Sequence, residues 1–408
     1  MKFTNDRKGI VLMAIKVALC GVSGYARTYV NGLTQLQDKG EIDFAAAVIR
    51  NPAKEPEVAA DFTRRGIRLF RDTATLYKEC PGIDLVCIPT GIASHEPLTV
   101  EALENGCNVL VEKPLCGCME AARSIVAAEK RTGKTVMVGY QHIYLPGIQA
   151  IKRHLVSGRL GRVRRITAAG LWPRGDAYYA RNAWVGKLAV NGVPVCDSPI
   201  NNAFAHYLNI SLFFAGASFE EMMIPVTMRA EMYRCRNTIE TFDSCAVKVG
   251  SAEGVEILAL FCHTCPENYS PVIHVECEKG SADWQDGKGW SVKASDGSVI
   301  ESQELGAAVD RSFMFEAAIA RAAGKKVFIC SAKASAVQTF CIDSMHKNFT
   351  INAVPPEFFT RREEDGVLVL RDAQKSFLTA RDKFCTLGEI GVPWGAPSRT
   401  VDLGPFSL

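Results

Sequence analysis

The chain contains no apolar run of eighteen or more residues, no block of five or six like charges and no internal repeat. An apolar run of that length is what a transmembrane helix needs, so we expect no membrane span. Lysine and arginine total 47 while aspartate and glutamate total 44, which gives a formal charge of only +3. This balance argues against a dedicated nucleic-acid binder and leaves small molecules as the expected partners.

The sequence also lacks the cysteine spacing of a disulfide framework. Its 15 cysteines are odd in number and scattered through apolar stretches, so we expect reduced thiols and a cytoplasmic protein. Lys16 interrupts the apolar stretch near the start, and Leu19 before Cys20 is not the small residue that a cleavage site prefers. An export signal is therefore not expected, and residues 1–13 are predicted to be a tail.

One group of metal-capable side chains stands out, Cys262-His263-Thr264-Cys265 with Cys277 nearby. It lies in a strand pattern, where alternate residues face opposite sides, and it lacks the doubled C-x-x-C spacing of many zinc sites. We therefore expect no metal. His263, at the end of that strand, is instead a candidate for substrate contact.

The first part of the chain alternates short apolar runs with helical stretches. Strand-like runs occur at 15–19, 44–49, 85–89, 108–112 and 135–139, and helical stretches include 97–106 and 118–133. Because strands that are apolar along their whole length suit a parallel sheet with helices on both faces, we predict an α/β fold. Residues 1–142 are expected to form a dinucleotide-binding Rossmann domain with a doubly wound parallel sheet. The length of 408 residues leaves room for at least one more domain.

A glycine turn follows the first strand-like run directly. The candidate cofactor-binding residues of this turn are Gly21, Val22, Ser23, Gly24, Tyr25 and Ala26. Gly21 allows the tight turn, Gly24 lets the backbone approach a pyrophosphate, and the following helix offers unpaired N–H groups to the phosphates. The carboxylate that selects NAD at the end of the second strand is missing, since Ile49 is followed by Arg50. We therefore expect NADP or NAD, with NADP favoured through Arg50. A solvated surface arginine is the alternative.

Two further stretches, "IPTGIASHEPLTVEALENG" (88–106) and "VLVEKPL" (109–115), complete a recognisable pattern. Together with the glycine turn and residues 139–168, the sequence resembles the glucose-fructose oxidoreductase and inositol dehydrogenase family, Gfo/Idh/MocA. The resemblance implies a second α+β domain, residues 143–365, built on an open, mostly antiparallel sheet. That sheet would carry the substrate site and often a subunit interface, so a homo-oligomer, a dimer or tetramer, is expected. Residues 366–408 would add a C-terminal helix and an extended arm.

The resemblance also implies roles for residues of these stretches. Lys113 would point its amine between nicotinamide and substrate and stabilise charge that develops on the reacting oxygen. Pro114 would fix the backbone there, where a cis peptide bond is affordable. Further cofactor-side residues are Pro89, Thr90, His95 and Glu112. His95 could instead cap its helix.

The second catalytic feature is "CDSPINNAFAHYLNISLFFAG" (196–216). His206 is the expected proton carrier for the substrate hydroxyl, and Asn202 is expected four residues earlier on the same helix face. The family's pattern carries an aspartate where this chain has Asn202. An amide positions an imidazole but does not stabilise an imidazolium by charge, so Asp197 is a candidate to replace the missing carboxylate or to bind substrate hydroxyls.

Between these two features lies a segment, residues 171–187, that is dense in aromatic and basic side chains. Its candidate substrate-binding residues are Trp172, Arg174, Tyr179, Arg181 and Asn182. The aromatic rings could stack on a sugar ring, and the cations could bind a carboxylate or phosphate. An inter-subunit contact or simple packing are the alternatives.

The predicted function is an NAD(P)-dependent oxidoreductase that transfers a hydride between nicotinamide and a hydroxyl or carbonyl carbon of a sugar, cyclitol or sugar acid. Two alternatives stay open. The first is a redox-neutral enzyme that cleaves a glycoside with retained NAD. The second is a non-catalytic dinucleotide or sugar sensor.

Overall fold

The computed structural model describes residues 14–304 and 310–408, so the tail predicted for residues 1–13 lies outside the described residues. Its first sheet has six parallel strands in the order β3-β2-β1-β4-β5-β6. These strands are β1 (Ile15–Cys20), β2 (Ile42–Val48), β3 (Arg68–Phe70), β4 (Leu85–Ile88), β5 (Asn108–Val111) and β6 (Val136–Val138). The order reverses between β1 and β4, as in a doubly wound sheet.

Helices alternate with these strands along the chain. They are α1 (Ala26–Asp38), α2 (Pro56–Arg64), α3 (Thr73–Glu79), α4 (His95–Glu104) and α5 (Met119–Thr132). The central strand β4 is buried throughout, as a parallel strand between two helical layers must be. The predicted Rossmann sheet is therefore confirmed. The sequence analysis missed the edge strand β3, because it has only three residues and Arg68 within it is exposed.

The second sheet has ten strands and is mostly antiparallel, as predicted. Its path runs β16-β15-β14-β13-β7-β12-β11-β10-β17, and β20 pairs with β10. The strands are β7 (Val163–Leu171), β10 (Thr227–Arg234), β11 (Ser244–Gly250), β12 (Glu256–Cys262), β13 (Tyr269–Cys277), β14 (Gly280–Gln285), β15 (Gly289–Ala294), β16 (Val299–Glu304), β17 (Ile351–Ala353) and β20 (Val401–Asp402). Parallel pairing occurs between β7 and β12 and between β10 and β17.

β12 and β13 follow one another in the chain, but they are not neighbours in the sheet. β7 lies between β12 and β13, with Ala168 opposite Ala259 on one side and opposite Ile273 on the other. The central place suits β7 because its last six residues are all buried. β13 instead forms a hairpin with β14.

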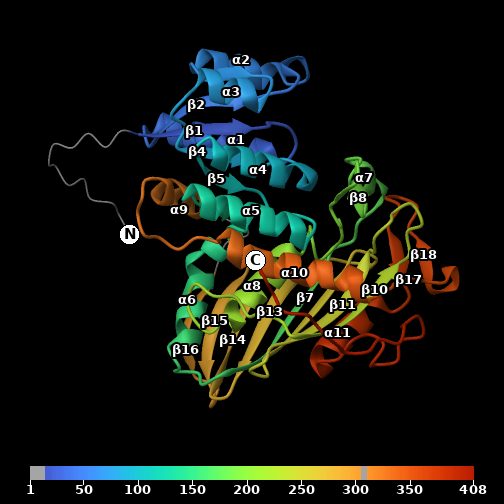
Figure 1. The fold of residues 1–408 in the computed structure, drawn as a ribbon. Helices are drawn as coiled ribbons and strands as arrows, with labels where there is room; N and C mark the ends of the chain where they lie inside the picture. Colours follow the sequence, from blue (N-terminus) through green and yellow to red (C-terminus); the bar gives the residue numbers. More distant parts are fainter. Residues whose placement is uncertain (1–13, 305–309) are drawn as a thin grey trace.

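Helices cover the second sheet unevenly (Figure 1). α6 (Pro146–Val156) and α8 (Ala205–Ala215) contact one face, and α11 (Ala373–Lys383) contacts β7 and β12 from the other. The remaining elements are α7 (Asp176–Ala180), β8 (Ala189–Val190), β9 (Val193–Pro194), α9 (Ser312–Ala322), α10 (Ala332–Asn348), β18 (Phe359–Arg361) and β19 (Leu368–Leu370). The strands β18 and β19 form a hairpin. Its buried Leu368 and Leu370 join a core beneath it.

The two sheets share one continuous core, which contains buried side chains from β1 at one end and β15 at the other. In Figure 1 the helix α10 crosses between the sheets, where it contacts α5, α8 and β6. Just before α10, the Cys330 carbonyl accepts a hydrogen bond from Val138 of β6 at 2.8 Å. Residues well beyond 142 therefore extend the edge of the first sheet, and the predicted domain boundaries stay a prediction.

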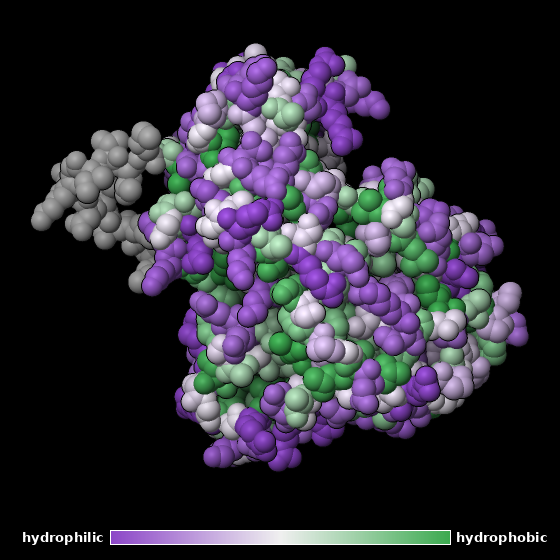
Figure 2. All heavy atoms as spheres, viewed as in Figure 1, coloured by the Kyte–Doolittle hydropathy of each residue, from purple (hydrophilic) through white to green (hydrophobic). Residues whose placement is uncertain are grey.

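The surface mixes side chains of both kinds. In the view of Figure 2, hydrophilic residues dominate the upper part, which contains the first sheet, and hydrophobic residues are scattered among hydrophilic ones below. Within residues 14–304 and 310–408, no helix has the length and hydropathy needed to cross a membrane.

Candidate active site

A groove lies at the carboxyl ends of β1, β2 and β4. Its volume is about 560 Å³. Among its lining residues are Gly21, Val22, Ser23, Arg50, Asn51, Lys54, Arg71, Thr90 and Gly91. Gly21 has φ +91°, and an added Cβ there would meet the Thr90 methyl at 3.5 Å. Gly24 has φ +60° with open space around its Cα. These glycines permit a close backbone approach, so the groove fits a dinucleotide pyrophosphate at the start of α1.

The cations of this groove lack acidic partners. Arg50, Lys54 and Arg71 are exposed, and none forms an ion pair within the described part of the chain. The neighbouring carboxylates are engaged elsewhere, since Asp72 accepts a 2.7 Å bond from the Thr75 N–H and Glu55 pairs with Arg27. Ile49, where an NAD-selective site has its acid, is buried. The groove therefore presents free positive charge near the place of a ribose 2′ group.

Pro89, Thr90 and His95 lie on the far side of the groove, between β4 and α4. Thr90 lines the groove, and Pro89 is buried directly before it. His95 is fully buried, with Nδ1 at 2.8 Å from the Pro114 carbonyl oxygen and Nε2 at 3.0 Å from the Thr90 carbonyl oxygen. Burial lowers the pKa of His95. Both ring nitrogens face backbone, so this imidazole braces the two loops that flank the groove.

Two charged residues, Glu112 and Lys113, directly follow β5. The Glu112 carboxyl is buried and accepts hydrogen bonds from the Tyr29 hydroxyl at 2.8 Å and from the Lys113 N–H at 3.1 Å. Burial raises the pKa of Glu112 to about 7. The Lys113–Pro114 peptide is cis. Glu112 therefore braces the strand end and leaves the Lys113 side chain directed away from it.

The Lys113 side chain reaches the turn that carries Asn202. Its Nζ donates to the backbone oxygen of Asn202 at 2.8 Å and to the side-chain Oδ1 of Asn202 at 3.1 Å. Burial lowers the pKa of this lysine. Two residues that are 89 positions apart in the sequence thus meet across the region between the two sheets.

Asn202 does not share a helix with His206, which corrects the sequence interpretation. α8 begins at Ala205, and Asn202 lies in the turn before it, where its N–H donates to the Ser198 oxygen at 2.9 Å. From this turn the Asn202 amide nitrogen donates to Asp197 Oδ1 at 2.8 Å, and Asp197 Oδ2 accepts from the Gly186 N–H at 2.7 Å. Burial raises the pKa of Asp197. Lys113, Asn202 and Asp197 therefore form one chain of hydrogen bonds.

His206, on the first turn of α8, faces a second imidazole that the sequence analysis missed. Its side chain packs against His142 with 4.4 Å between ring centroids, and the two residues are 6% and 4% exposed. Neither ring nitrogen of His142, nor Nδ1 of His206, has a hydrogen-bond partner among the described residues. Burial, followed by the charge of His142, lowers the pKa of His206 well below its usual value.

Further polar groups lie around this histidine pair. The Tyr140 ring is 5.7 Å from that of His206, and its hydroxyl has no partner among the described residues. Asp286 Oδ1 lies 3.8 Å from His142 Nε2, and Asp286 Oδ2 accepts a 2.8 Å bond from the Tyr207 hydroxyl. The sequence could have indicated Tyr140 and His142, because both follow the last parallel strand. Ligands of such sheets bind at the edge where the strands end. Unpaired buried polar atoms of this kind are what a polyhydroxylated ligand would satisfy.

The aromatic and basic residues of segment 171–187 lie in two separate places. Trp172 stacks on Phe204 at 4.6 Å, and His263 lies 5.2 Å from the same ring, so both lie beside the turn that carries Asn202. His263 Nδ1 donates to the Trp172 carbonyl oxygen at 2.9 Å, while its Nε2 has no partner in the described structure. Burial lowers the pKa of His263 to about 3.

Arg174 and Arg181 lie over the face of Tyr178, with guanidinium-to-centroid distances of 5.1 and 3.6 Å. Tyr179 and Asn182 belong to a different depression, near Arg236 and Asp176. Arg236 covers the Tyr179 ring at 4.6 Å. The structure thus brings four of the six predicted substrate residues, Trp172, Arg174, Arg181 and His263, to one place and sends the other two away from it.

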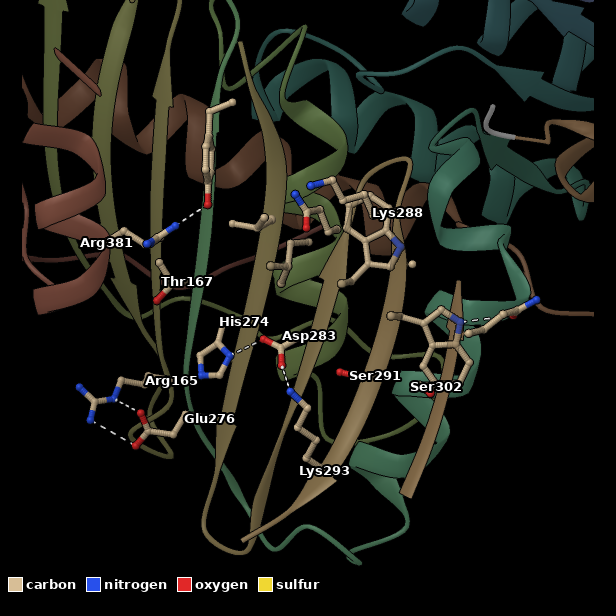
Figure 3. A pocket seen from close by; sticks show the side chains of 18 of the residues that line it. Arg165, Thr167, His274, Glu276, Asp283, Lys288, Ser291, Lys293, Ser302 and Arg381 are labelled. Carbon is tan, nitrogen blue, oxygen red and sulfur yellow. Dashed lines mark hydrogen bonds and ion pairs between the residues drawn. The ribbon is translucent and has the colours of Figure 1, made fainter. Parts of the chain in front are cut away.

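A further hollow lies on the outward face of β13–β16 and contains none of the predicted site residues (Figure 3). Its charged groups mostly pair with one another, as in Arg165 with Glu276 and Asp283 with His274. Across residues 14–304 and 310–408, no cluster of three or more histidine, cysteine or acidic side chains is arranged to hold a metal ion.

Comparisons with known proteins agree with this architecture. Residues 15–140 match the model of an oxidoreductase family with an NAD-binding Rossmann fold. The chain is 28% identical over 169 residues to inositol 2-dehydrogenase/D-chiro-inositol 3-dehydrogenase of Lacticaseibacillus casei, covering 41% of this chain and 48% of that protein. It is 34% identical over 97 residues to scyllo-inositol 2-dehydrogenase (NAD(+)) of Bacillus subtilis, covering 24% of this chain and 28% of that protein. The alignments thus span half or less of these relatives.

A solved structure extends the likeness to both sheets. The WlbA dehydrogenase of Bordetella pertussis, in complex with NADH and UDP-GlcNAcA, superposes with a TM-score of 0.65 at 18% identity. The match covers 82% of this chain and 96% of that one. At this identity the likeness shows the fold alone.

Proposed function

The chain belongs to the Gfo/Idh/MocA oxidoreductase family, and on this premise we propose that it is an NAD(P)-dependent dehydrogenase acting on a CH–OH group of a sugar, cyclitol or sugar acid. The observation that carries the proposal is the contact of the Lys113 ammonium with Asn202, in the turn before the helix of His206. The nicotinamide, when bound, supplies the hydride chemistry. Gly21 and Thr90 of the groove, together with Gly24 just before α1, would hold the dinucleotide.

Lys113 would stabilise the reacting oxygen. Its two hydrogen bonds both go to oxygens of Asn202, so the third ammonium proton is available to a substrate oxygen. A positive charge fixed in a water-poor site favours an alkoxide-like oxygen in the transition state. The Asn202–Asp197 link keeps the lysine in place without a direct ion pair.

His206 would move the hydroxyl proton. Its lowered pKa keeps the imidazole neutral at pH 7, which is the form that accepts a proton. Its Nδ1 has no partner among the described residues. In the reverse direction the same imidazole, once protonated, would return the proton to the carbonyl oxygen.

The preferred cofactor in this proposal is NADP. Support comes from the three cations Arg50, Lys54 and Arg71, which line the groove without acidic partners in the described residues. A 2′-phosphate carries two negative charges that such cations bind, whereas NAD offers a neutral hydroxyl that prefers a carboxylate. Calorimetric titration with NADP⁺ and NAD⁺ tests this. Equal affinities would remove the preference and leave NAD as an equal candidate.

The test of the function combines binding with turnover. The purified protein is first checked for a co-purified nicotinamide, then titrated with NADPH and NADH, and the preferred oxidised form is used in a fluorescence screen of polyols, sugars and sugar acids. We expect reduced cofactor to appear with one substrate class. Lys113→Ala should lower turnover at least a hundredfold and leave cofactor affinity unchanged, while the exposed control Lys130→Ala should match the wild type. Unchanged turnover in Lys113→Ala would contradict the assignment.

Two other outcomes correspond to the alternatives. Product formation without net change in NAD(P)H would identify a redox-neutral enzyme with retained cofactor. Tight cofactor binding with no turnover would favour a sensor. Asn202, in place of the family's aspartate, is the one feature that favours these alternatives, because it removes a charge beside the proton carrier.

We further propose that the protein is a cytoplasmic homo-oligomer. All fifteen cysteines are free thiols and thirteen of them are buried, which suits a reducing compartment. The outward face of β13–β16 forms a hollow that α11 borders through Arg381 and Asp382, and it is the surface on which we expect a second copy (Figure 3).

A further inference from the structure

Two arginines near the candidate site have no carboxylate to bind. Within the described chain, the Arg174 guanidinium donates only to the carbonyl oxygen of Pro173, at 3.2 Å, and its Nε has no partner there. The Arg181 guanidinium lies over the Tyr178 ring, and neither guanidinium is in an ion pair within the described chain. The one acidic residue of segment 171–187, Asp176, forms ion pairs with Arg236 and Arg361.

These cations lie within range of the reacting groups. The Arg174 N–H donates to the His263 carbonyl oxygen at 3.1 Å, and the charges of both arginines contribute to the lowered pKa of His263. The charge of Arg181 also acts on the pKa values of Lys113 and Asp197. Arg174 also lies 5.3 Å from the centroid of the Trp172 ring, which stacks on Phe204 beside the turn that carries Asn202.

Among the described residues, the carboxylates of the site form no hydrogen bond or ion pair with these arginines. Glu112 is bonded to Tyr29 and the Lys113 N–H, Asp197 to Gly186 and Asn202, and Asp286 to Tyr207. Each acid thus has its own donors, while the two guanidiniums have none of the acceptors they prefer. A neutral polyol would leave this surplus of positive charge uncompensated.

We propose that the substrate carries an anionic oxygen group, a carboxylate or a phosphate, at the end remote from the reacting hydroxyl, and that Arg174 and Arg181 bind it. Trp172 and Tyr178 would contact the apolar face of the sugar between the two ends. This inference rests on the proposed function and narrows its substrate class to acidic sugars or cyclitols. It also gives a role to the two planar guanidiniums, whose donors match such groups in pairs.

Matched ligands test the proposal. The protein loaded with its preferred oxidised cofactor is assayed with hexoses, the corresponding hexuronates and the hexose 6-phosphates, by thermal shift and by reduction of the cofactor. We expect hexuronates or phosphates to bind and turn over at least tenfold better than the neutral hexoses, and the better of the two identifies the anionic group. Equal or better values for the neutral sugars would overturn the inference and leave the dehydrogenase proposal standing.

Substitutions of the two arginines test whether these side chains bind the anionic group. Arg174→Gln and Arg181→Gln should each raise KM for the acidic substrate at least tenfold, with a small change in kcat and none in cofactor affinity. The exposed, unpaired Arg159 provides the control Arg159→Gln. An acid-dependent thermal shift that these variants abolish, without turnover of any ligand, would support the anion site while contradicting the dehydrogenase. An acid preference that survives in both variants would place the anion elsewhere and contradict the assignment.

Discussion

Asn202 couples a lysine to a carboxylate without carrying a charge itself. Its Oδ1 accepts from Lys113 and its amide nitrogen donates to Asp197, so the order of donors and acceptors along the three residues is fixed. An aspartate at position 202 could accept from Lys113 but could not donate to Asp197. Asp197 thus supplies the carboxylate that the family pattern has at position 202, and it is linked to the lysine through the Asn202 side chain.

This arrangement predicts the effect of restoring the family's aspartate. Asn202→Asp places two carboxyl groups 2.8 Å apart, so one must take up a proton or the turn must shift. We expect a loss of about 1–3 kcal/mol of stability and lower kcat/KM at pH 8. The exchanged pair Asp197→Asn with Asn202→Asp removes the like charges and should regain most of the stability. Equal stability of the single and double variants in denaturant titrations would contradict the coupling.

The buried His206 predicts an unusual pH profile. A neutral imidazole is the form that accepts the hydroxyl proton, and the pKa of His206 is lowered well below 6.5 by burial. In the oxidation direction, kcat/KM should therefore stay level as pH falls through 6.5 and decline only at lower pH. Steady-state rates from pH 8 to 5 measure this. A decline centred at or above pH 6.5 would show that His206 is not the group that titrates.

At the scale of secondary structure, α8 depends on a lysine of another helix. Lys152 of α6 is fully buried and donates to the Phe213 and Gly216 carbonyl oxygens, at 2.5 and 2.6 Å, at the carboxyl end of α8. The Phe213 carbonyl also accepts a 3.2 Å bond from the Gly216 N–H, so the lysine adds a second donor at the last turn of the helix. Since His206 is on the first turn of α8, this contact helps to hold the helix that positions it.

Burial lowers the pKa of Lys152 to about 7. The unfolded chain, with an ordinary lysine, binds more protons than the folded chain between pH 7 and about 10. Wild-type stability should therefore gain about 2 kcal/mol from this group as pH rises from 7 to 9. Lys152→Met should lack this gain, and the exposed Lys130→Met should keep it. Denaturant titrations at both pH values compare the three proteins, and parallel curves for wild type and Lys152→Met would contradict the assignment.

Local patterns predicted the elements of the first sheet well, because each of its longer strands is an apolar run between turns. They failed where position depends on distant partners. Nothing within 254–284 indicates that β7, nearly a hundred residues earlier, enters between β12 and β13. The start of α8 was misplaced for a related reason, since the spacing from Asn202 to His206 is equally compatible with a turn that leads into a helix.

The site itself was only partly predictable for the same reason. Lys113 and His206 follow recognisable motifs, and their roles stay predictions. His142 and Arg311 have no motif of their own. Arg311 donates to the Tyr25 hydroxyl at 3.2 Å, and its charge contributes to the lowered pKa of His206, although 105 residues separate the two in sequence. Only the packing of α9 against the 141–144 turn brings it there.

For the whole molecule, the open hollow on the outer face of β13–β16 predicts self-association. We expect light scattering to give a mass that is a whole multiple, two or four, of the 44.5 kDa chain. Ser291 and Ser302 lie on this face (Figure 3). Ser291→Arg with Ser302→Arg should reduce the mass to that of one chain without lowering the unfolding temperature by more than a few degrees. A monomeric wild-type protein would contradict the prediction.

The nucleotide groove is lined wholly by residues between Cys20 and Leu98, whereas the unpaired arginines, His206 and His263 all come from residues 171–263. We therefore expect the first 142 residues to determine coenzyme choice and residues 171–263 to determine most of the substrate choice, although Lys113, Tyr140 and His142 of the first part also border the candidate substrate site. A chimera that joins the first 142 residues to the remainder of a related enzyme should inherit its coenzyme from one parent and its substrate from the other. Such an exchange would let related enzymes acquire new substrates during evolution without a change in their cofactor-binding domain.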